Sequence, residues 1–348
     1  MRIIHANPWI PGLFTLAAMA GQPAQGGNFV YTTIDVPGAS ATYPGSINDQ
    51  GVVAGAYTTS PTSAQSGFIW SNGAITTFTR PHPSRSIGVA GIDDRGSVAF
   101  SAGGIRGGGS QAAVRHPDGH VTRVPTPADA LGWSSAVNGL GQIVGGYESS
   151  PGSADRTGFL FKDGQFQTLA FPGAALTTPT GIAKNGTVIG SYSAGDADGA
   201  HGFVYRNGSY QSFDPPKSTY TMVNSINARG DIAGTIYTAQ LGTGTLGYVF
   251  SGGKYHIYAL RRGKEYVNEV TWAGSASYVA GNFYNLVNEI AFTHLRGQYY
   301  RVLPFGAANS YVYAGNRQGT LVGIYWGADD VMHGFIAVCP AGQAPCTN

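Results

Sequence analysis

The chain has 348 residues, of which only 11% are charged, and its formal net charge is +2. So small a positive charge, with no run of lysine and arginine among aromatic residues, argues against a nucleic-acid partner. Nothing after residue 20 approaches eighteen consecutive apolar residues, so we expect no membrane span. The 53 glycines, the frequent Tyr and Thr, and the lack of long Ala-, Leu-, Glu- and Lys-rich runs favour short strands joined by tight turns.

Residues 1–20 match a secretory signal peptide. Arg2 supplies the positive start, residues 10–18 are a short apolar stretch, and Ala18-Met19-Ala20 is a small-residue cleavage pattern. We therefore predict a secreted or periplasmic protein in which residues 21–27 are a linker. A cytosolic tail is the alternative interpretation of the same residues.

Residues 28–338 repeat one pattern seven times, at a spacing of about forty-five residues. The first half of each copy is a turn followed by small residues, as in Asn48–Gly55 and Asn138–Gly145. The second half is a Gly-aromatic pair, as in Gly67-Phe68. A period of this size, built from short β-like runs and Gly turns, is typical of a propeller or solenoid.

The fourth copy predicts four antiparallel strands, over residues 180–183, 187–193, 201–205 and 209–213. The last two are joined by Asn207-Gly208, and Asn-Gly between apolar runs is a strong hairpin signal because a type I′ turn needs positive φ at both central positions. Four such strands make one propeller blade, and neighbouring blades must stack to bury both faces of each sheet.

The seventh copy lacks a fourth strand, and the missing pattern lies at the other end of the chain, in Val30–Gly38. We therefore predict an all-β, seven-bladed β-propeller over residues 28–338, with four antiparallel strands per blade. Residues 30–38 should pair with residues 334–338, so that the N-terminal strand closes the ring and removes two exposed sheet edges.

Residues 339–348 form a C-terminal tail that contains the only two cysteines, Cys339 and Cys346. In an oxidising compartment we expect them to close a small disulfide loop, and two free thiols are the alternative. Their spacing matches no zinc motif, and no metal or phosphate motif occurs elsewhere, so we predict neither metal nor cofactor.

Three phrases, Ile34–Gly38, Ser46–Gly51 and His201-Gly202-Phe203, resemble the HAF-repeat family of predicted bacterial extracellular proteins. The resemblance extends over about residues 28–338 and implies propeller-type repeats in an extracellular protein. It brings no established activity or catalytic residues. Copies two and six depart most from the pattern, because Phe100 replaces the second Gly and residues 273–277 lose the turn motif.

Polar residues that recur between copies are assigned to structure. One turn position recurs in five copies, and its side chain should bond neighbouring backbone groups; it is occupied by Asn48, Asp93, Asn138, Asn227 and Asn316. His201 and His333 both precede a Gly-aromatic pair, and we assign them to strand edges as well.

The charged residues that do not recur gather on one rim, where strand four leads to the next blade and strand two leads to strand three. All four glutamates fall in or beside these loops: Glu148, Glu265, Glu269 and Glu289. Solvated loops carry charge for trivial reasons, which is one interpretation, and a binding face is the other.

The positions eight residues before each landmark glycine should form a shallow cup on the inner strands, unless their aromatic rings only brace the blades. These positions are Tyr43, Gly88, Trp133, Thr178, Met222, Glu269 and Tyr311. Aromatic faces stack on sugars, and carboxylates bond hydroxyl groups.

Charge density is highest over residues 260–269, where Arg261, Arg262 and Lys264 suit a uronate, sulfate or other anionic group. We therefore predict a carbohydrate or other anionic extracellular ligand. The candidate ligand-binding residues are Tyr43, Trp133, Glu148, Tyr220, Arg261, Arg262, Lys264 and Tyr311. The candidates for proton transfer are Tyr266, His82 and Glu269.

Three functions remain open from the sequence. The first is a secreted propeller that binds a carbohydrate, in particular an acidic glycan. The second is an enzyme that acts on an acidic polysaccharide, by β-elimination or by hydrolysis. The third is an adhesive or structural surface protein without a small-molecule site. Degenerate copies favour the first two, and the absence of a recognisable catalytic phrase favours binding over catalysis.

Overall fold

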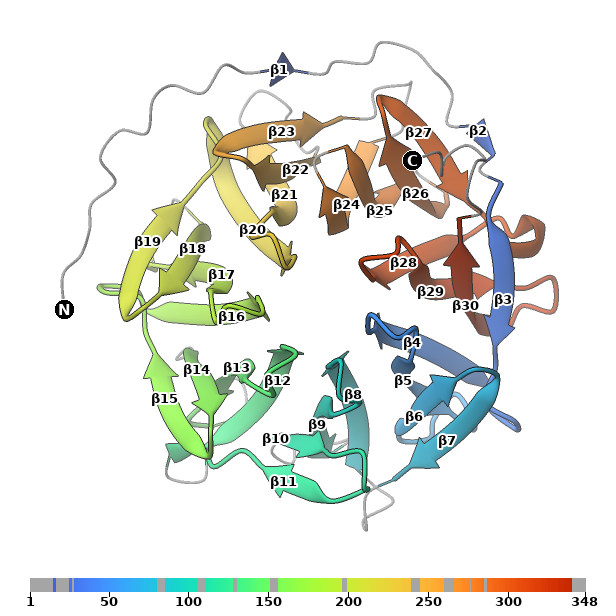
Figure 1. Ribbon diagram of the computed structural model, residues 1–348, viewed down its shortest axis with the longest axis horizontal. Coiled ribbons are helices and arrows are strands. Elements are labelled where there is room, and N and C mark those ends of the chain that lie inside the picture. The colour runs from blue at the N-terminus through green and yellow to red at the C-terminus, as the bar shows by residue number, and fades with distance from the viewer. Residues whose placement is uncertain are drawn as a thin grey trace.

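Figure 1 shows four-stranded sheets arranged as a ring around a central axis in the computed structural model. The structure describes residues 15–16, 25–26, 28–79, 85–104, 110–127, 130–150, 156–195, 199–238, 245–259, 266–275, 277–284 and 287–339. Most of these residues are in strands, and a short 3-10 turn lies at Pro304–Gly306. No helix in these ranges has the length and hydropathy needed to cross a bilayer.

Each blade is an antiparallel sheet of consecutive strands, with its first strand next to the axis (Figure 1). Blade I contains β4 (Ala41–Ile47), β5 (Val53–Thr58), β6 (Ser66–Ser71) and β7 (Ala74–Phe78). Blade II contains β8 (Arg85–Ile92), β9 (Val98–Gly104), β10 (Gln111–Arg115) and β11 (Val121–Arg123). Blade III contains β12 (Leu131–Val137), β13 (Ile143–Glu148), β14 (Thr157–Lys162) and β15 (Gln165–Leu169).

The second half of the chain continues the same order. Blade IV contains β16 (Leu176–Ile182), β17 (Val188–Ser193), β18 (His201–Arg206) and β19 (Ser209–Phe213). Blade V contains β20 (Ser218–Ile226), β21 (Ile232–Thr238), β22 (Thr245–Ser251) and β23 (Lys254–Tyr258). Blade VI contains β24 (Tyr266–Ser275), β25 (Tyr278–Tyr284), β26 (Glu289–Leu295) and β27 (Gln298–Val302). Two short strands, β1 (Thr15–Leu16) and β2 (Gln25–Gly26), pair in parallel with β23 and β27.

Blade VII combines the two ends of the chain. It contains β28 (Ser310–Gly315), β29 (Leu321–Trp326) and β30 (Met332–Val338), and β3 (Val30–Ile34) pairs antiparallel with β30. Val30 lies opposite Val338 and Ile34 opposite Gly334, so the predicted pairing of these two segments is present. One bridge between Met332 and Ala41 joins this sheet to blade I. The blade count is therefore about seven, in agreement with the repeat.

The predicted strand boundaries in blade IV hold within one residue for three strands, but the first strand was placed too late. β16 begins at Leu176, four residues before the predicted start at Thr180. Pro179 pairs with Gly190 within β16, beside a register shift before Gly181, and bulges are places where a strand tolerates proline.

The second glycine of the repeated pattern, which lies in strand two, exists because an aromatic ring from strand three lies against it. In blade III Gly145 is opposite Phe159, and a Cβ atom on Gly145 would lie 1.9 Å from the Trp133 carbonyl oxygen and 2.8 Å from the Phe159 ring. The ring itself is fully buried. Any larger residue at the glycine would push the inner strand or the ring out of place.

Blade II reverses this arrangement, which explains why its copy departs from the pattern. Phe100 occupies the glycine position and is 1% exposed, and it lies opposite Ala113, which occupies the aromatic position. The large and small side chains have exchanged strands, so the space between the sheets is filled with about the same volume.

The recurring turn asparagine links neighbouring blades, as its predicted structural role requires. Its Oδ1 accepts hydrogen bonds from its own turn, and its Nδ2 donates to the carbonyl at the same position of the next blade. The four bonds run from Asn48 to Asp93 (2.9 Å), Asn138 to Ala183 (3.0 Å), Asn227 to Ala273 (3.1 Å) and Asn316 to Asn48 (3.1 Å). The last of these joins blade VII to blade I.

A histidine fastens the segment after β3 to blade VII. His333 Nδ1 lies 2.8 Å from Asp35 Oδ2, and Nε2 lies 3.2 Å from Asp329 Oδ1. His201 and Asp214 form the equivalent pair in blade IV, at 3.1 Å. Partial burial disfavours the charged ring of His333, but the hydrogen bonds and charges of Asp35 and Asp329 outweigh it and raise the pKa of His333.

Two predicted features lie mainly outside the described residues. Apart from β1 the proposed signal peptide falls there, and so does Cys346. Cys339 is described and packs against the core of blade VII, where it follows β30. The disulfide, the leader and the secreted location therefore stay predictions.

Deleting residues 28–38 should give an aggregated or much less stable protein. The deletion removes the buried side chains of Phe29, Ile34 and Val36, each worth about 1.5–3 kcal/mol, and exposes the edge of β30. Thermal unfolding and size-exclusion chromatography measure both effects. A deletion variant that melts like the parent would contradict the closing role of β3.

His333→Gln should remove a pH-dependent part of the stability. Because the folded-state pKa of His333 is raised, its contribution is complete below pH 6.5 and is lost as the pH rises through the folded pKa. The difference in melting temperature between parent and variant should therefore be larger at pH 5.5 than at pH 8.5. A difference that does not change with pH would show that the Asp35–His333–Asp329 contacts do not depend on the ring's charge.

Candidate functional site: the central channel

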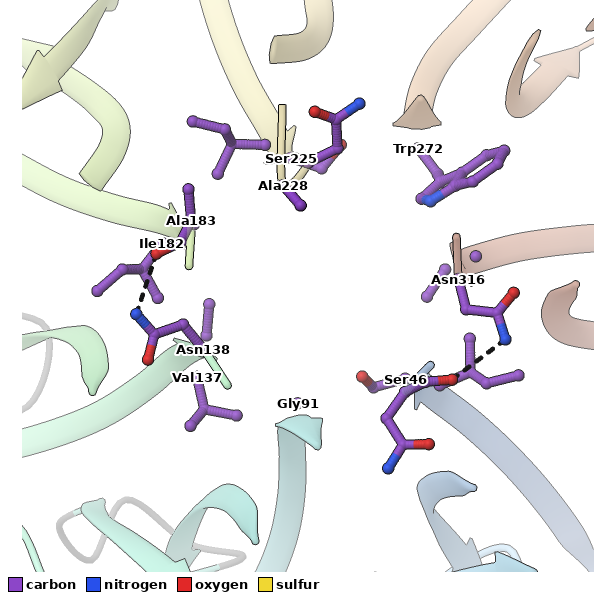
Figure 2. A pocket seen from close by; sticks show the side chains of 18 of the residues that line it. Ser46, Gly91, Val137, Asn138, Ile182, Ala183, Ser225, Ala228, Trp272 and Asn316 are labelled. Atoms are coloured by element: carbon purple, nitrogen blue, oxygen red, sulfur yellow. Dashed lines mark hydrogen bonds between the residues drawn. The ribbon is translucent and has the colours of Figure 1, made fainter. Parts of the chain in front are cut away.

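The inner strands β4, β8, β12, β16, β20, β24 and β28 surround the axis of the ring (Figure 1), and we call the region along this axis the channel. Different segments form its two ends. We call the end formed by the turns between strands one and two the turn rim. The other end, formed by the loops between blades and between strands two and three, is the loop rim. A cavity of about 470 Å³ occupies the turn-rim end, lined by the last residues of the inner strands and by the turns (Figure 2).

Side chains facing the axis form two layers along the inner strands. The first layer lines the cavity at Gly45, Ala90, Ser135, Thr180, Asn224, Thr271 and Tyr313. Two residues earlier lie the seven predicted cup positions, and strand alternation directs them to the same side. In agreement, Tyr43 and Tyr311 are half-buried, whereas their neighbours Thr42, Ser310 and Val312 are buried between the blades.

Three of the predicted site residues, Tyr43, Glu269 and Tyr311, lie near one another where blades VI, VII and I meet. The Tyr311 and Tyr313 rings are 4.7 Å apart between centroids, and Tyr43 and Glu269 act electrostatically on Tyr313. We call Tyr43, Glu269, Asn282, Tyr311 and Tyr313 together the Glu269 cluster. Sequence reasoning missed Tyr313 and Asn282. Tyr313 follows Tyr311 by two residues, so the period of a strand could have identified it.

Asn282 fixes Glu269 to the neighbouring blade. Its Nδ2 donates to Glu269 Oε1 (3.2 Å) and to the carbonyl of Val312 (3.2 Å), and its Oδ1 accepts from the Val312 backbone N–H (2.9 Å). Asn282 is fully buried on β25, while Val312 belongs to the inner strand of blade VII. The carboxylate is therefore held in one orientation between two blades.

The cluster disfavours negative charge. Burial raises the pKa of Glu269, and the charge of Glu289 raises it further, while the hydrogen bond from Asn282 acts in the opposite direction. Burial, followed by the charges of Glu289, Tyr43 and Glu269, raises the pKa of Tyr313 to about 12. The carboxylates of Glu269 and Glu289 thus lie near the Tyr313 hydroxyl, which keeps its proton.

Other predicted residues lie apart from this cluster. The Trp133 indole covers Gly146, where a Cβ atom would lie 2.3 Å from Trp133 Cζ2, so this ring braces blade III. Tyr220 is 37% exposed on blade V and forms an edge-to-face pair with Tyr237 at 5.6 Å. Glu148 ends β13, with Arg156 Nε 3.9 Å from its carboxylate.

Several predicted residues lie outside the described ranges. They are His82, Arg261, Arg262 and Lys264. Tyr266 begins β24, three residues before Glu269. In the sequence, the basic segment 260–265 directly precedes the inner strand that carries Glu269.

The turn rim carries an ion-pair chain that crosses several blades and that sequence reasoning missed. Arg317 Nε lies 2.6 Å from Asp49 Oδ2, and Lys184 Nζ lies 3.6 Å from the same oxygen and also pairs with Asp94. Burial of Asp94 is outweighed by its bonds with Lys184 and the Asp49 N–H, which lower its pKa. Asp49, Asp94 and Arg317 each directly follow the recurring turn asparagine or aspartate in the sequence, and this spacing could have identified the ion pairs.

Within the described ranges no group of three His, Cys, Asp or Glu side chains is placed to hold a metal ion. The described part of the channel offers aromatic surface, carboxylates and amides. These groups can bind hydroxyl-rich molecules.

No family model matches the chain, and no curated protein matches it either. Its membership of the HAF-repeat family thus stays a prediction. Solved structures are similar in fold alone. YCF48 bound to a D1 peptide is 10% identical, with a TM-score of 0.55, and the match covers 93% of this chain and 100% of that one.

Two propellers of peptidases are similar to the same degree. The β-propeller domain of the trilobed protease from Pyrococcus furiosus is 11% identical, with a TM-score of 0.60, over 86% of this chain and 94% of that one. A prolyl endopeptidase is 10% identical, with a TM-score of 0.59, over 83% of this chain and 47% of that one. Together these similarities establish the β-propeller fold.

Glu269→Gln should stabilise the protein at neutral pH. Because the pKa of Glu269 is raised on folding, its ionised form costs stability above the folded pKa, and this cost disappears as the pH falls toward the unfolded value. The gain in melting temperature should thus be larger at pH 7.5 than at pH 4. Glu148→Gln, on the same rim outside the cluster, controls for the loss of one negative charge, and equal gains in both variants would contradict the prediction.

Proposed function

We propose that the protein is a binding propeller that holds a carbohydrate at the loop-rim end of its channel, against the Glu269 cluster. The observation that carries the proposal is the convergence of two half-buried tyrosines, an oriented carboxylate and a further tyrosine from three blades. Aromatic faces stack on the C–H surface of a sugar, and fixed carboxylates accept hydrogen bonds from its hydroxyl groups.

The basic segment 260–265 supports an acidic glycan over a neutral one. Glu269 and Glu289 would repel an acid group placed among the tyrosines. Arg261, Arg262 and Lys264 lie in the segment that leads into β24, so they can receive a uronate or sulfate while the hydroxyl groups of the ligand contact Glu269. In this arrangement the basic residues of the rim bind the acid group of the ligand, and the carboxylates bind its hydroxyl groups.

The proposal includes a seven-bladed ring closed by β3 and an export signal in residues 1–20. An exported protein would meet glycans at the cell surface or outside it. The propeller neighbours include one whose title gives a bound peptide and others from peptidases, so a peptide ligand is the outcome that a screen must separate from a glycan.

A second candidate is hydrolysis or β-elimination of the same acidic glycan. The observation in its favour is the raised pKa of Glu269 beside Glu289, because a carboxyl that retains its proton can act as a general acid. In that case Glu269→Gln abolishes turnover and leaves binding. With a binding function alone, no new reducing ends or unsaturated uronates form in any variant.

Titration of the mature protein with galacturonate and glucuronate oligomers, after a glycan-array screen, tests the proposal. Tyr311→Ala should weaken binding roughly 2- to 10-fold, the effect of losing an aromatic contact worth about 0.5–1.5 kcal/mol. Arg95→Ala, an exposed residue on the turn rim, is the control and should bind normally. Equal effects in both variants, or binding of peptides but of no glycan, would overturn the carbohydrate proposal.

A further inference from the structure

The junction between blades II and III lacks the amide bond that a turn asparagine forms at four other junctions. At the recurring turn position blade II carries Asp93, which is 2% exposed. Its Oδ1 accepts from the backbone N–H groups of Arg95 (2.9 Å) and Ser97 (2.7 Å). Asn48 Oδ1 accepts from the two equivalent N–H groups at 3.0 and 2.9 Å, so the two side chains have the same orientation.

This orientation places Asp93 Oδ2 where the other blades have an amide nitrogen. In those blades Nδ2 donates to the carbonyl at the same position of the next blade, which for blade II is the carbonyl of Asn138. An ionised carboxylate cannot donate. Asp93 Oδ2 is buried and has no hydrogen-bond partner among the described residues, and two oxygen acceptors thus face each other.

A buried acceptor without a partner costs roughly 1–3 kcal/mol, and more when it is charged, so such an oxygen normally indicates a bound species. The fold does not require a side chain here. Ala183 and Ala273 occupy the same position in blades IV and VI, and these junctions form without an amide bond from this position. Blade II therefore keeps a costly oxygen where an alanine or an asparagine would serve the fold.

We propose that Asp93 and the carbonyl of Asn138 form a site for one small cation, either a hydrogen ion held on the carboxyl group or a metal ion. Both species supply the positive charge that the two oxygens lack. Asp93 and Asn138 line the cavity of the turn rim, which gives the cation a route from solvent. The site is separate from the Glu269 cluster and does not depend on the proposed carbohydrate function.

The charges around the site are largely compensated. Asp94, the next residue, is paired with Lys184, and Lys184 also lies 3.6 Å from Asp49. Arg317 pairs with Asp49 and acts on Asp94. Arg95 contacts Asp93 through its backbone N–H, and its side chain is exposed. Arg229, which also lines the cavity, lies 3.1 Å from Asp231. The structure pairs none of these cations with Asp93 Oδ2.

Thermal unfolding of the full chain and of Asp93→Asn tests the proposal, because asparagine restores the amide bridge and abolishes the site. Both proteins are melted from pH 5 to pH 8.5, in choline chloride with a chelator, in sodium chloride and in calcium chloride. A bound hydrogen ion makes the parent lose stability relative to Asp93→Asn as the pH rises, whatever the salt. A bound metal ion makes the parent gain stability relative to the variant when that metal is added. A shift of about 2–4 °C between conditions is the size expected for a single site in a chain of this length.

Asn48→Asp is the matched control, since it places a carboxylate oxygen opposite the carbonyl of Asp93 in the same geometry. It should acquire the same pH or metal dependence as the parent has at Asp93. If Asn48→Asp does not fold, the comparison of the parent with Asp93→Asn decides alone. The proposal would be overturned if the difference in melting temperature between the parent and Asp93→Asn changed with neither pH nor added metal. It would also be overturned if Asp93→Asn were less stable than the parent under every condition.

Discussion

Four junctions between neighbouring blades depend on a side-chain amide that satisfies two blades at once. An asparagine in the first turn of a blade accepts hydrogen bonds from its own turn and donates to the turn of the next blade. The bond is 2.9–3.1 Å long and buried or partly buried, so it holds the two adjacent sheets at a set distance. Asn316 extends the same bond from blade VII to blade I, and the last and first copies of the repeat are thereby linked in the same way as blades I and II. The channel, with its two unlike ends, follows from that spacing.

The two ends of the channel have different chemistry because different kinds of segment form them. The turn rim is built from short turns that repeat, so its charged residues can pair across blades, as Arg317, Asp49 and Lys184 do. The loop rim is built from segments that differ in every copy. The inner-strand positions beside it likewise vary between blades, from Tyr43 and Tyr311 to Glu269, and such variable residues suit recognition of a ligand better than support of the ring.

The sequence was sufficient for the fold but only partly for the site, for a physical reason. Gly turns and Gly-aromatic pairs are local signals, and each copy repeats them, so the blades and the pairing of residues 30–34 with β30 could be predicted. The cup positions could also be placed, since strand period and repeat register put Tyr43, Glu269 and Tyr311 at one level. Which of these touch each other depends on the order of blades around the axis. Asn282, whose partners lie 13 and 30 residues away, shows no local pattern at all.

The exchange of large and small residues in blade II constrains how this repeat can change over time. Phe100 alone changed to glycine would leave a void the size of a phenyl ring, and Ala113 alone changed to phenylalanine would force two rings into one space. Both orientations of the pair fill the space between the strands, but a single substitution between them is destabilising. Blade II can therefore return to the common pattern without a destabilised intermediate only by a double substitution or by replacement of the whole repeat through recombination. A coupled pair of this kind distinguishes blade II from the blades that keep the common orientation.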